Sequence, residues 1–191
     1  MTLADQLRIQ AHANRLANHR LHGAMATLDD TAFHAPRVSF FPSLAATLNH
    51  ILGVDQYYIG ALCGDAGLAA HWQRFVPDAT LPALAARQQA SDERLIAFCA
   101  GLDEAACERI VDMPRDAGRV QRDRAAHVLA HLLMHQTHHR GQVHSMLSST
   151  VVQPPQLDEF LMPSDAHFRS ADMAALGWSE VLVYGPLPPG G

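Results

Sequence analysis

Two histidines four residues apart are the first feature of this sequence that could support chemistry. His135 and His139 lie in the stretch HVLAHLLMHQTHHRGQVHSML, residues 127–147, which holds six of the thirteen histidines. At about 100° per residue their side chains share one helical face, so both imidazoles can reach a single ion about 2 Å from each nitrogen. Surface histidines and core histidines bonded to carbonyl groups also show this spacing. A third ligand is therefore needed to distinguish a metal site from these alternatives.

The rest of that helical face is apolar, which makes the two histidines unusual there. Polar groups on a core-facing stripe need partners, and a metal ion would satisfy both rings. His144 falls on the opposite face, where we expect it in solvent. The apolar positions that share the stripe are Val128, Leu132 and Met146.

A third histidine lies on a second predicted helix. Residues 39–62, SFFPSLAATLNHILGVDQYYIGAL, read as a helix capped by Ser39 or Ser43, with Pro42 tolerated in the first turn. His50 is expected to face the interior midway along its apolar stripe, which comprises Ala46, His50, Val54, Tyr57 and Ala61. Together with His135 and His139 it would supply three neutral nitrogen donors, enough for a site with one open position.

The remaining pattern supplies the elements that must position these residues. Amphipathic spacing predicts helices over 2–29 and 83–100, and the histidine-rich helix over 123–148. Residues 30–42 and 62–82 read as connections. Residues 108–122 read as two short extended pieces around a turn from Pro114 to Gly118, which would form a short β-hairpin or an ordered loop. Four such helices predict an all-α four-helix bundle, in which metal sites are built from inward side chains of facing helices.

The helix over 83–100 has a predicted inner and outer face. Leu84, Gln88, Leu95 and Phe98 are expected to face inward, and the charged side chains Arg87, Asp92, Glu93 and Arg94 to be mostly solvated. The three cysteines, Cys63, Cys99 and Cys107, are expected to be buried thiols rather than ligands.

A change in composition after Thr150 marks the end of the bundle. Six prolines follow, so we expect a bundle over residues 1–160 and an extension over residues 161–191 that packs on it. The extension is predicted to be mostly irregular, with a short helix near 165–176, Phe160 and Trp178 as anchors, and a frayed end over 186–191.

Composition excludes several classes of protein. A chain of 191 residues with 48% hydrophobic and 17% charged residues suits one globular domain. The net charge of −5 and pI near 6.2 argue against nucleic-acid binding, which needs clustered Lys and Arg. No apolar run reaches membrane-spanning length, and three cysteines without a CxxC pair or a signal peptide favour the cytoplasm.

Several segments together resemble a known family. TLNHILGVD around His50, HQTHHRGQVHSML from His135 and ANRLANHRL in the first helix are similar to the damage-inducible DinB/YfiT-like family of bacterial proteins, over roughly residues 3–160. The resemblance implies a four-helix bundle that forms homodimers and holds one divalent metal ion through His50, His135 and His139. Zinc or nickel is favoured, and iron or cobalt would also suit three imidazoles. Ala13 and Leu16 stand where the family often has aromatic residues, so the pocket wall is expected to be wider here.

The resemblance also implies a range of functions. The wider superfamily includes enzymes that use low-molecular-weight thiols, so a metal-dependent hydrolase and a thiol-dependent transferase both remain open, with a small-molecule substrate. The alternative is a non-catalytic metal-binding, structural or interaction module. Peptidase activity is disfavoured, because Gln136 stands where a zincin protease has a glutamate and cannot act as a general base.

Other polar and aromatic residues near these motifs have structural or supporting roles to distinguish. Asp55 is expected to be an interhelix partner and His138 a structural residue. Arg140 and Gln142 could orient the ligand histidines or a substrate anion, or be solvated. His131 could border the pocket or lie at the bundle surface, and Tyr57 and Tyr58 are more typical of a core than of a cavity wall.

Overall fold

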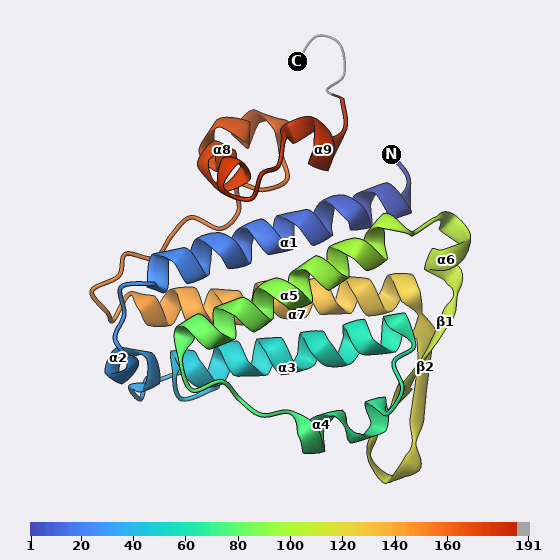
Figure 1. Ribbon diagram of the computed structural model, residues 1–191, viewed down its shortest axis with the longest axis horizontal. Helices are drawn as coiled ribbons and strands as arrows, with labels where there is room; N and C mark the ends of the chain where they lie inside the picture. The colour runs from blue at the N-terminus through green and yellow to red at the C-terminus, as the bar shows by residue number, and fades with distance from the viewer. Residues whose placement is uncertain (187–191) are drawn as a thin grey trace.

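Four long helices form the centre of the computed structural model, which describes residues 1–186 (Figure 1). They are α1 (Leu3–Met25), α3 (Leu44–Cys63), α5 (Leu81–Ala100) and α7 (Ala125–Leu147). Helix α1 packs against α5 and α7, and α3 packs against the same two helices, so the four enclose a common core. The predicted all-α four-helix bundle is confirmed.

Side-chain caps explain where three of these helices begin. Thr2, Ser43 and Thr80 each accept a hydrogen bond from the backbone N–H three residues later. Such a cap satisfies one of the free donors at a helix N-terminus. The cap of α3 is therefore Ser43 rather than Ser39, and residues 35–43 form a loop before the helix. Helix α3 ends at Cys63 and is capped by Gly64, whose φ of +74° suits glycine.

The predicted hairpin is present beside the last long helix. Strands β1 (Ile110–Pro114) and β2 (Val120–Arg124) pair antiparallel, with Ile110 opposite Arg124 and Pro114 opposite Val120. A short 3₁₀ turn, η2 (Asp116–Gly118), joins them. The Tyr57 hydroxyl of α3 donates a hydrogen bond to the Pro114 carbonyl, which ties the hairpin to the bundle.

Short helices occupy segments in which the sequence pattern predicted no helix. They are α2 (Asp30–His34), η1 (Leu68–Ala70), α4 (His71–Arg74) and α6 (Glu104–Glu108). None of them exceeds five residues, so hydrophobic periodicity could not distinguish them from loops.

The C-terminal segment packs along α1 (Figure 1). It contains η3 (Pro163–Asp165), α8 (Ala166–Ala175) and α9 (Glu180–Tyr184), of which α8 was predicted and α9 was not. Phe160 is buried against α1 and Trp178 is partly buried in the same cluster. The guanidinium of Arg20 forms ion pairs of 2.7 Å with both Glu159 and Asp172. Residues 187–191 of the predicted frayed end lie outside the described residues.

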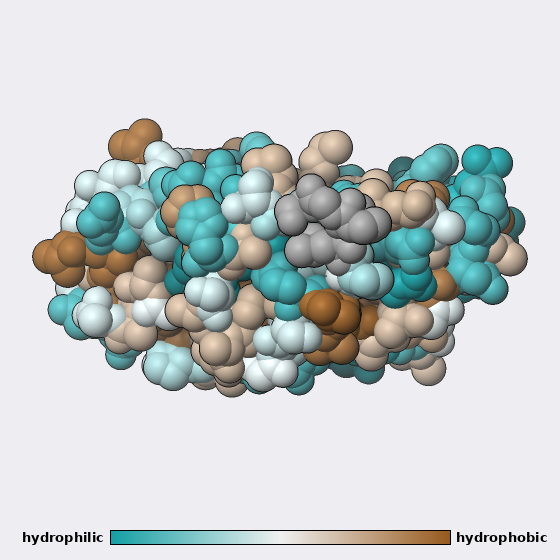
Figure 2. All heavy atoms as spheres, turned by 90° about the horizontal axis from the view of Figure 1, so that it is seen from above, coloured by the Kyte–Doolittle hydropathy of each residue, from teal (hydrophilic) through white to brown (hydrophobic). Residues whose placement is uncertain are grey.

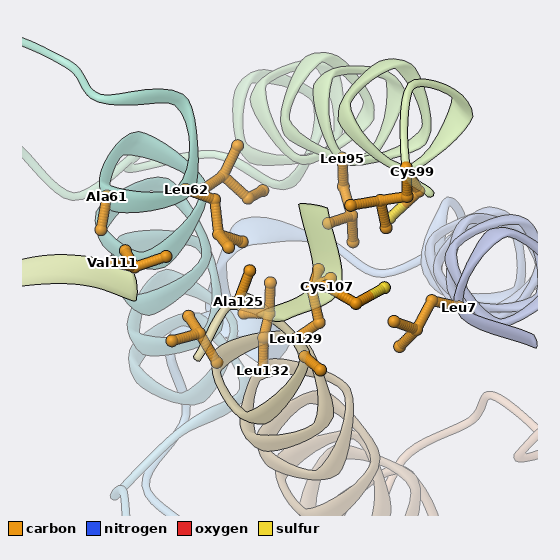
Figure 3. Close-up of a cluster of buried hydrophobic side chains, with 14 of the residues drawn as sticks. Leu7, Ala61, Leu62, Leu95, Cys99, Cys107, Val111, Ala125, Leu129 and Leu132 are labelled. Atoms are coloured by element: carbon orange, nitrogen blue, oxygen red, sulfur yellow. The ribbon is translucent and has the colours of Figure 1, made fainter. Parts of the chain in front are cut away.

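Apolar side chains from all four long helices meet at the hairpin end of the bundle (Figure 3). Leu7, Leu62, Leu95 and Leu129 point toward one another there. Cys99 and Cys107 are buried in this cluster as expected, but the prediction for the third cysteine is wrong. Cys63 is exposed because it is the last residue of α3, where the helix leaves the core.

The described part of the chain has no helix that combines the length and the apolar character needed to cross a membrane. Seen from the side of α1 and the C-terminal helices, the surface mixes hydrophilic and hydrophobic residues without one broad apolar area (Figure 2).

Candidate metal centre

The packing of α3 against α7 brings the three predicted histidines together. The Nε2 atoms of His50 and His135 lie 2.9 Å apart. With His139 included, one ring nitrogen from each residue lies within 4.8 Å of the others. Three nitrogens bound to one tetrahedral ion would be roughly 3.3 Å apart. The cluster therefore fits a metal ion after only small rotations of the side chains.

Their environments keep the three rings uncharged. Burial, followed by repulsion from neighbouring histidines, lowers the pKa of His135 to about 3. Burial and repulsion from His139 lower the pKa of His50 to about 4. The pKa of His139 is also lowered by burial, although its hydrogen bond with Gln142 opposes this. At neutral pH all three rings are neutral, which is the protonation state that binds metals.

A glutamine orients one of the three rings. Nδ1 of His139 donates a hydrogen bond of 2.8 Å to Oε1 of Gln142, which leaves Nε2 of His139 as the available lone pair. The amide nitrogen of Gln142 lies 3.2 Å from Nε2 of the exposed His138. Gln142 thus fixes the orientation of the His139 ring, and His138 contacts the cluster through Gln142 and the edge of the His139 ring.

The remaining polar atom of the cluster belongs to His135. Its Nδ1 is buried and has no hydrogen-bond partner among residues 1–186. Metal-bound histidines usually donate their second N–H to an oxygen. Of the three rings, His139 has such a partner and His135 lacks one within the described chain.

An aromatic residue that the sequence analysis missed covers the cluster. The Phe41 ring centroid lies 4.4 Å from that of His50 and 5.6 Å from that of His139. Phe41 comes from the loop before α3, where Val38 and Phe40 are exposed. The signal in the sequence that could have revealed Phe41 is the Phe-Phe-Pro run just before Ser43, because a solvent-exposed loop does not need two consecutive phenylalanines. Phe41 gives the histidine cluster an apolar wall.

The candidate Arg140 and its neighbour Gln136 on α7 point away from the histidines into the bundle. Arg140 Nη1 donates to Oε1 of Gln136 at 2.9 Å, and the amide of Gln136 donates to Asp55. Asp55 is 2% exposed and is an interhelix partner, as expected. Arg140 is 8% exposed, so it is not a solvated arginine.

The prediction that Asp92 is solvated is wrong. Asp92 is 1% exposed and accepts hydrogen bonds from the side-chain amides of Asn18, at 3.0 and 3.1 Å, and Gln88, at 3.1 Å. The pattern of charged neighbours on α5 suggested solvent, but amides on α1 supply the partners that make burial possible. Asn14, Asn18, Asp55, Gln88, Asp92, Gln136 and Arg140 form this buried polar network, which links all four long helices.

Burial shifts the ionisation of the network. It raises the pKa of Asp92 to about 6 and that of Asp55 well above its ordinary value, with repulsion from Asp92 as a second cause for Asp55. It lowers the pKa of Arg140 to about 10, so this guanidinium stays protonated at neutral pH.

His131 and the two tyrosines lie toward the hairpin rather than at the cluster. His131 is exposed, and its ring centroid is 5.1 Å from that of Tyr58 and 6.4 Å from that of His135. Tyr57 is 1% exposed and belongs to the core. His131 borders a small cavity beside the hairpin with Tyr58 and Arg115.

Comparisons with known proteins agree with this architecture. The sequence matches the model of the DinB family over residues 8–170. The fold is similar to the crystal structure of a DinB-like protein, YjoA, from Bacillus subtilis, with a TM-score of 0.55 and 18% sequence identity over 80% of this chain and 96% of that chain. A search of curated proteins gave no match. Because the family model spans most of the sequence, the chain belongs to the DinB family.

Proposed function

We propose that His50, His135 and His139 bind one divalent metal ion. The observation that carries this proposal is the convergence of three neutral imidazoles from α3 and α7 within 4.8 Å. Zinc or nickel is the favoured ion, and iron or cobalt would accept the same ligands. Gln142 would hold the ring of His139 in its binding orientation.

Three protein ligands leave one tetrahedral position for a substrate or cosubstrate. A divalent ion at the cluster would supply Lewis-acid chemistry, lowering the pKa of a water or a thiol. Phe41 would form an apolar wall beside the bound molecule.

We place a thiol-dependent transferase ahead of a hydrolase. Among residues 1–186 no carboxylate joins the histidine cluster, and Gln136 is held away from it by Asp55 and Arg140. Hydrolysis commonly relies on a general base that activates water. A thiol becomes a nucleophile once it loses its proton, so thiol transfer does not require a general base among the surrounding side chains.

Metal content tests the site directly. Wild-type protein, purified without an affinity tag or chelator, is expected to contain about one ion per chain, and His50→Ala and His135→Ala are expected to lose it. His144→Ala, on the same helix but outside the cluster, is the matched control and should retain the ion. Metal content unchanged in both cluster variants would contradict the proposal.

Thiol binding separates a transferase from a non-catalytic module. Cobalt-substituted protein is expected to change its visible absorption spectrum when a low-molecular-weight thiol is added, because the thiolate would enter the open position. A screen of electrophilic substrates with that thiol would follow. A spectrum that no thiol changes would indicate a closed site and favour the metal-binding module.

We further propose that the protein is a cytoplasmic homodimer. Family membership supports the dimer, and the three unpaired cysteines, one of them exposed, suit a reducing compartment. Light scattering coupled to size-exclusion chromatography should give twice the chain mass of 20.8 kDa. A mass of one chain at micromolar concentration would contradict the dimer.

A further inference from the structure

We propose that a second cavity, on the side of α7 that faces α1, binds an organic monocarboxylate with an apolar body. The cavity has a volume of about 660 Å³ and lies between α1, α7 and residues 157–161. This volume is within the range of small-molecule sites. The inference goes beyond the proposed metal function and does not depend on it.

Apolar side chains form most of the cavity wall. Helix α1 contributes alanines, α7 contributes larger aliphatic residues, and the segment after the bundle closes the third side. These residues are Ala13, Ala17, Ala130, Leu133, Met134, Leu157, Phe160 and Leu161. Such a wall would hold a hydrocarbon or aromatic body by burial of apolar surface.

One buried cation, Arg140, lines the same cavity. Its Nη1 donates to the side-chain oxygens of Asn14, Asn18 and Gln136, which fix the plane of the guanidinium. Its Nε and Nη2 donate to no group among residues 1–186. Neither nitrogen is fully sealed from solvent, and Arg140 is one of the residues that line this cavity. We therefore infer that these N–H groups face the cavity.

The free N–H groups favour an anionic ligand. No carboxylate of the described chain forms an ion pair with Arg140, because Asp55 and Asp92 accept hydrogen bonds from amides instead. Burying N–H groups without acceptors costs free energy, and hydrogen bonds to a ligand oxygen would offset that cost. A planar carboxylate matches two parallel N–H groups of a guanidinium.

The cavity rim limits the charge of the ligand. His138 and Thr137 offer polar contacts, but the carboxylate of Asp158 also lines the cavity. Asp158 would repel a second negative charge, which disfavours dicarboxylates and phosphates relative to a monocarboxylate.

Calorimetric titration of the full-length protein with octanoate tests this site. Octanol has the same body without the charge, and octylamine has the opposite charge. Octanoate is expected to bind at least tenfold more tightly than either, because only it can pair with Arg140. Metal-free protein should bind octanoate as tightly as metal-loaded protein, so failure of the metal proposal would leave this result intact.

Two variants locate the binding. Arg140→Lys is expected to weaken octanoate binding by about 10- to 100-fold, since lysine retains the charge but loses the planar fork. Ala130→Trp, at an exposed position in the cavity wall, is expected to abolish binding by filling the cavity. Ala97→Trp, at an exposed position on α5 away from the cavity, is the matched control and should bind like wild type.

Octanol binding as tightly as octanoate would overturn the role of Arg140. Unchanged octanoate affinity in Ala130→Trp would overturn the location. If Arg140→Lys fails to fold, Ala130→Trp and the octanol comparison still decide the proposal, because neither alters the buried network.

Discussion

Helix α7 has two polar faces, one with His135 and His139 and the other with Gln136 and Arg140. The histidines cluster with His50 beside Phe41, and Gln142 accepts a hydrogen bond from His139. Nδ1 of His135 has no hydrogen-bond partner among residues 1–186. The second face instead joins a network in which amides, carboxylates and a guanidinium largely satisfy one another. Polar groups inside a bundle can thus remain available for a ligand or hold helices together, depending on the partners that other helices supply.

The largest expected effect comes from breaking the buried network. Asp92→Ala removes the acceptor for Asn18 and Gln88 and a nearby charge that stabilises protonated Arg140. Each buried amide left without an acceptor costs about 1–3 kcal/mol. We therefore expect a loss of about 2–5 kcal/mol in the free energy of unfolding, measured by urea denaturation. Asp116→Ala, in the exposed hairpin turn, is the control and should change stability by less than about 0.5 kcal/mol. Equal effects would show that the network does not stabilise the bundle.

The next effect concerns the histidine face. Gln142→Ala removes the acceptor for Nδ1 of His139 and frees its ring to rotate. We expect metal affinity to fall by about 10- to 100-fold, measured by competition with a chromophoric chelator. Gln89→Ala, an exposed glutamine on α5, should leave affinity unchanged. Wild-type affinity in Gln142→Ala would mean that packing alone orients His139.

The pH dependence of metal-free protein distinguishes the two faces by sign. Since the pKa of His50 falls from 6.5 to about 4 on folding, the unfolded chain binds more protons in that window, and this face loses stability as pH falls. The pKa of Asp92 rises from 3.8 to about 6, so the network loses stability as pH rises through that window. As pH falls from 6.5 to 4, the free energy of unfolding should therefore decrease less in His50→Ala than in wild type. A larger decrease in the variant would contradict the assignment of this pH effect to His50.

The smallest expected effect is at the edge of the cluster. His138→Ala removes an exposed ring that reaches the site only through Gln142 and the edge of the His139 ring. We expect stability to change by less than about 0.5 kcal/mol and metal affinity to fall less than in Gln142→Ala. Chemical denaturation and the same chelator competition measure both. A loss as large as that in Gln142→Ala would make His138 an essential part of the ligand support.

Hydrophobic periodicity was sufficient to predict the long helices and the helical face that His135 and His139 share. His135 and His139 share a face because they are four residues apart, and His50 falls on an apolar stripe of its own helix. The short helices were missed because a single turn carries no readable period. Phe41 was missed because a loop residue has no fixed direction until its neighbours pack.

Local sequence therefore determined which residues share a helical face, and with it the fold class and the histidines that are candidate ligands. The tertiary structure decided how each polar residue is used. Asp92 resembled its solvated neighbours in the sequence, yet it is buried because Asn18, 74 residues away, donates to it. Hydrogen-bond partners this distant are set by helix packing, because the free energy of burying a polar group depends on the atoms that surround it.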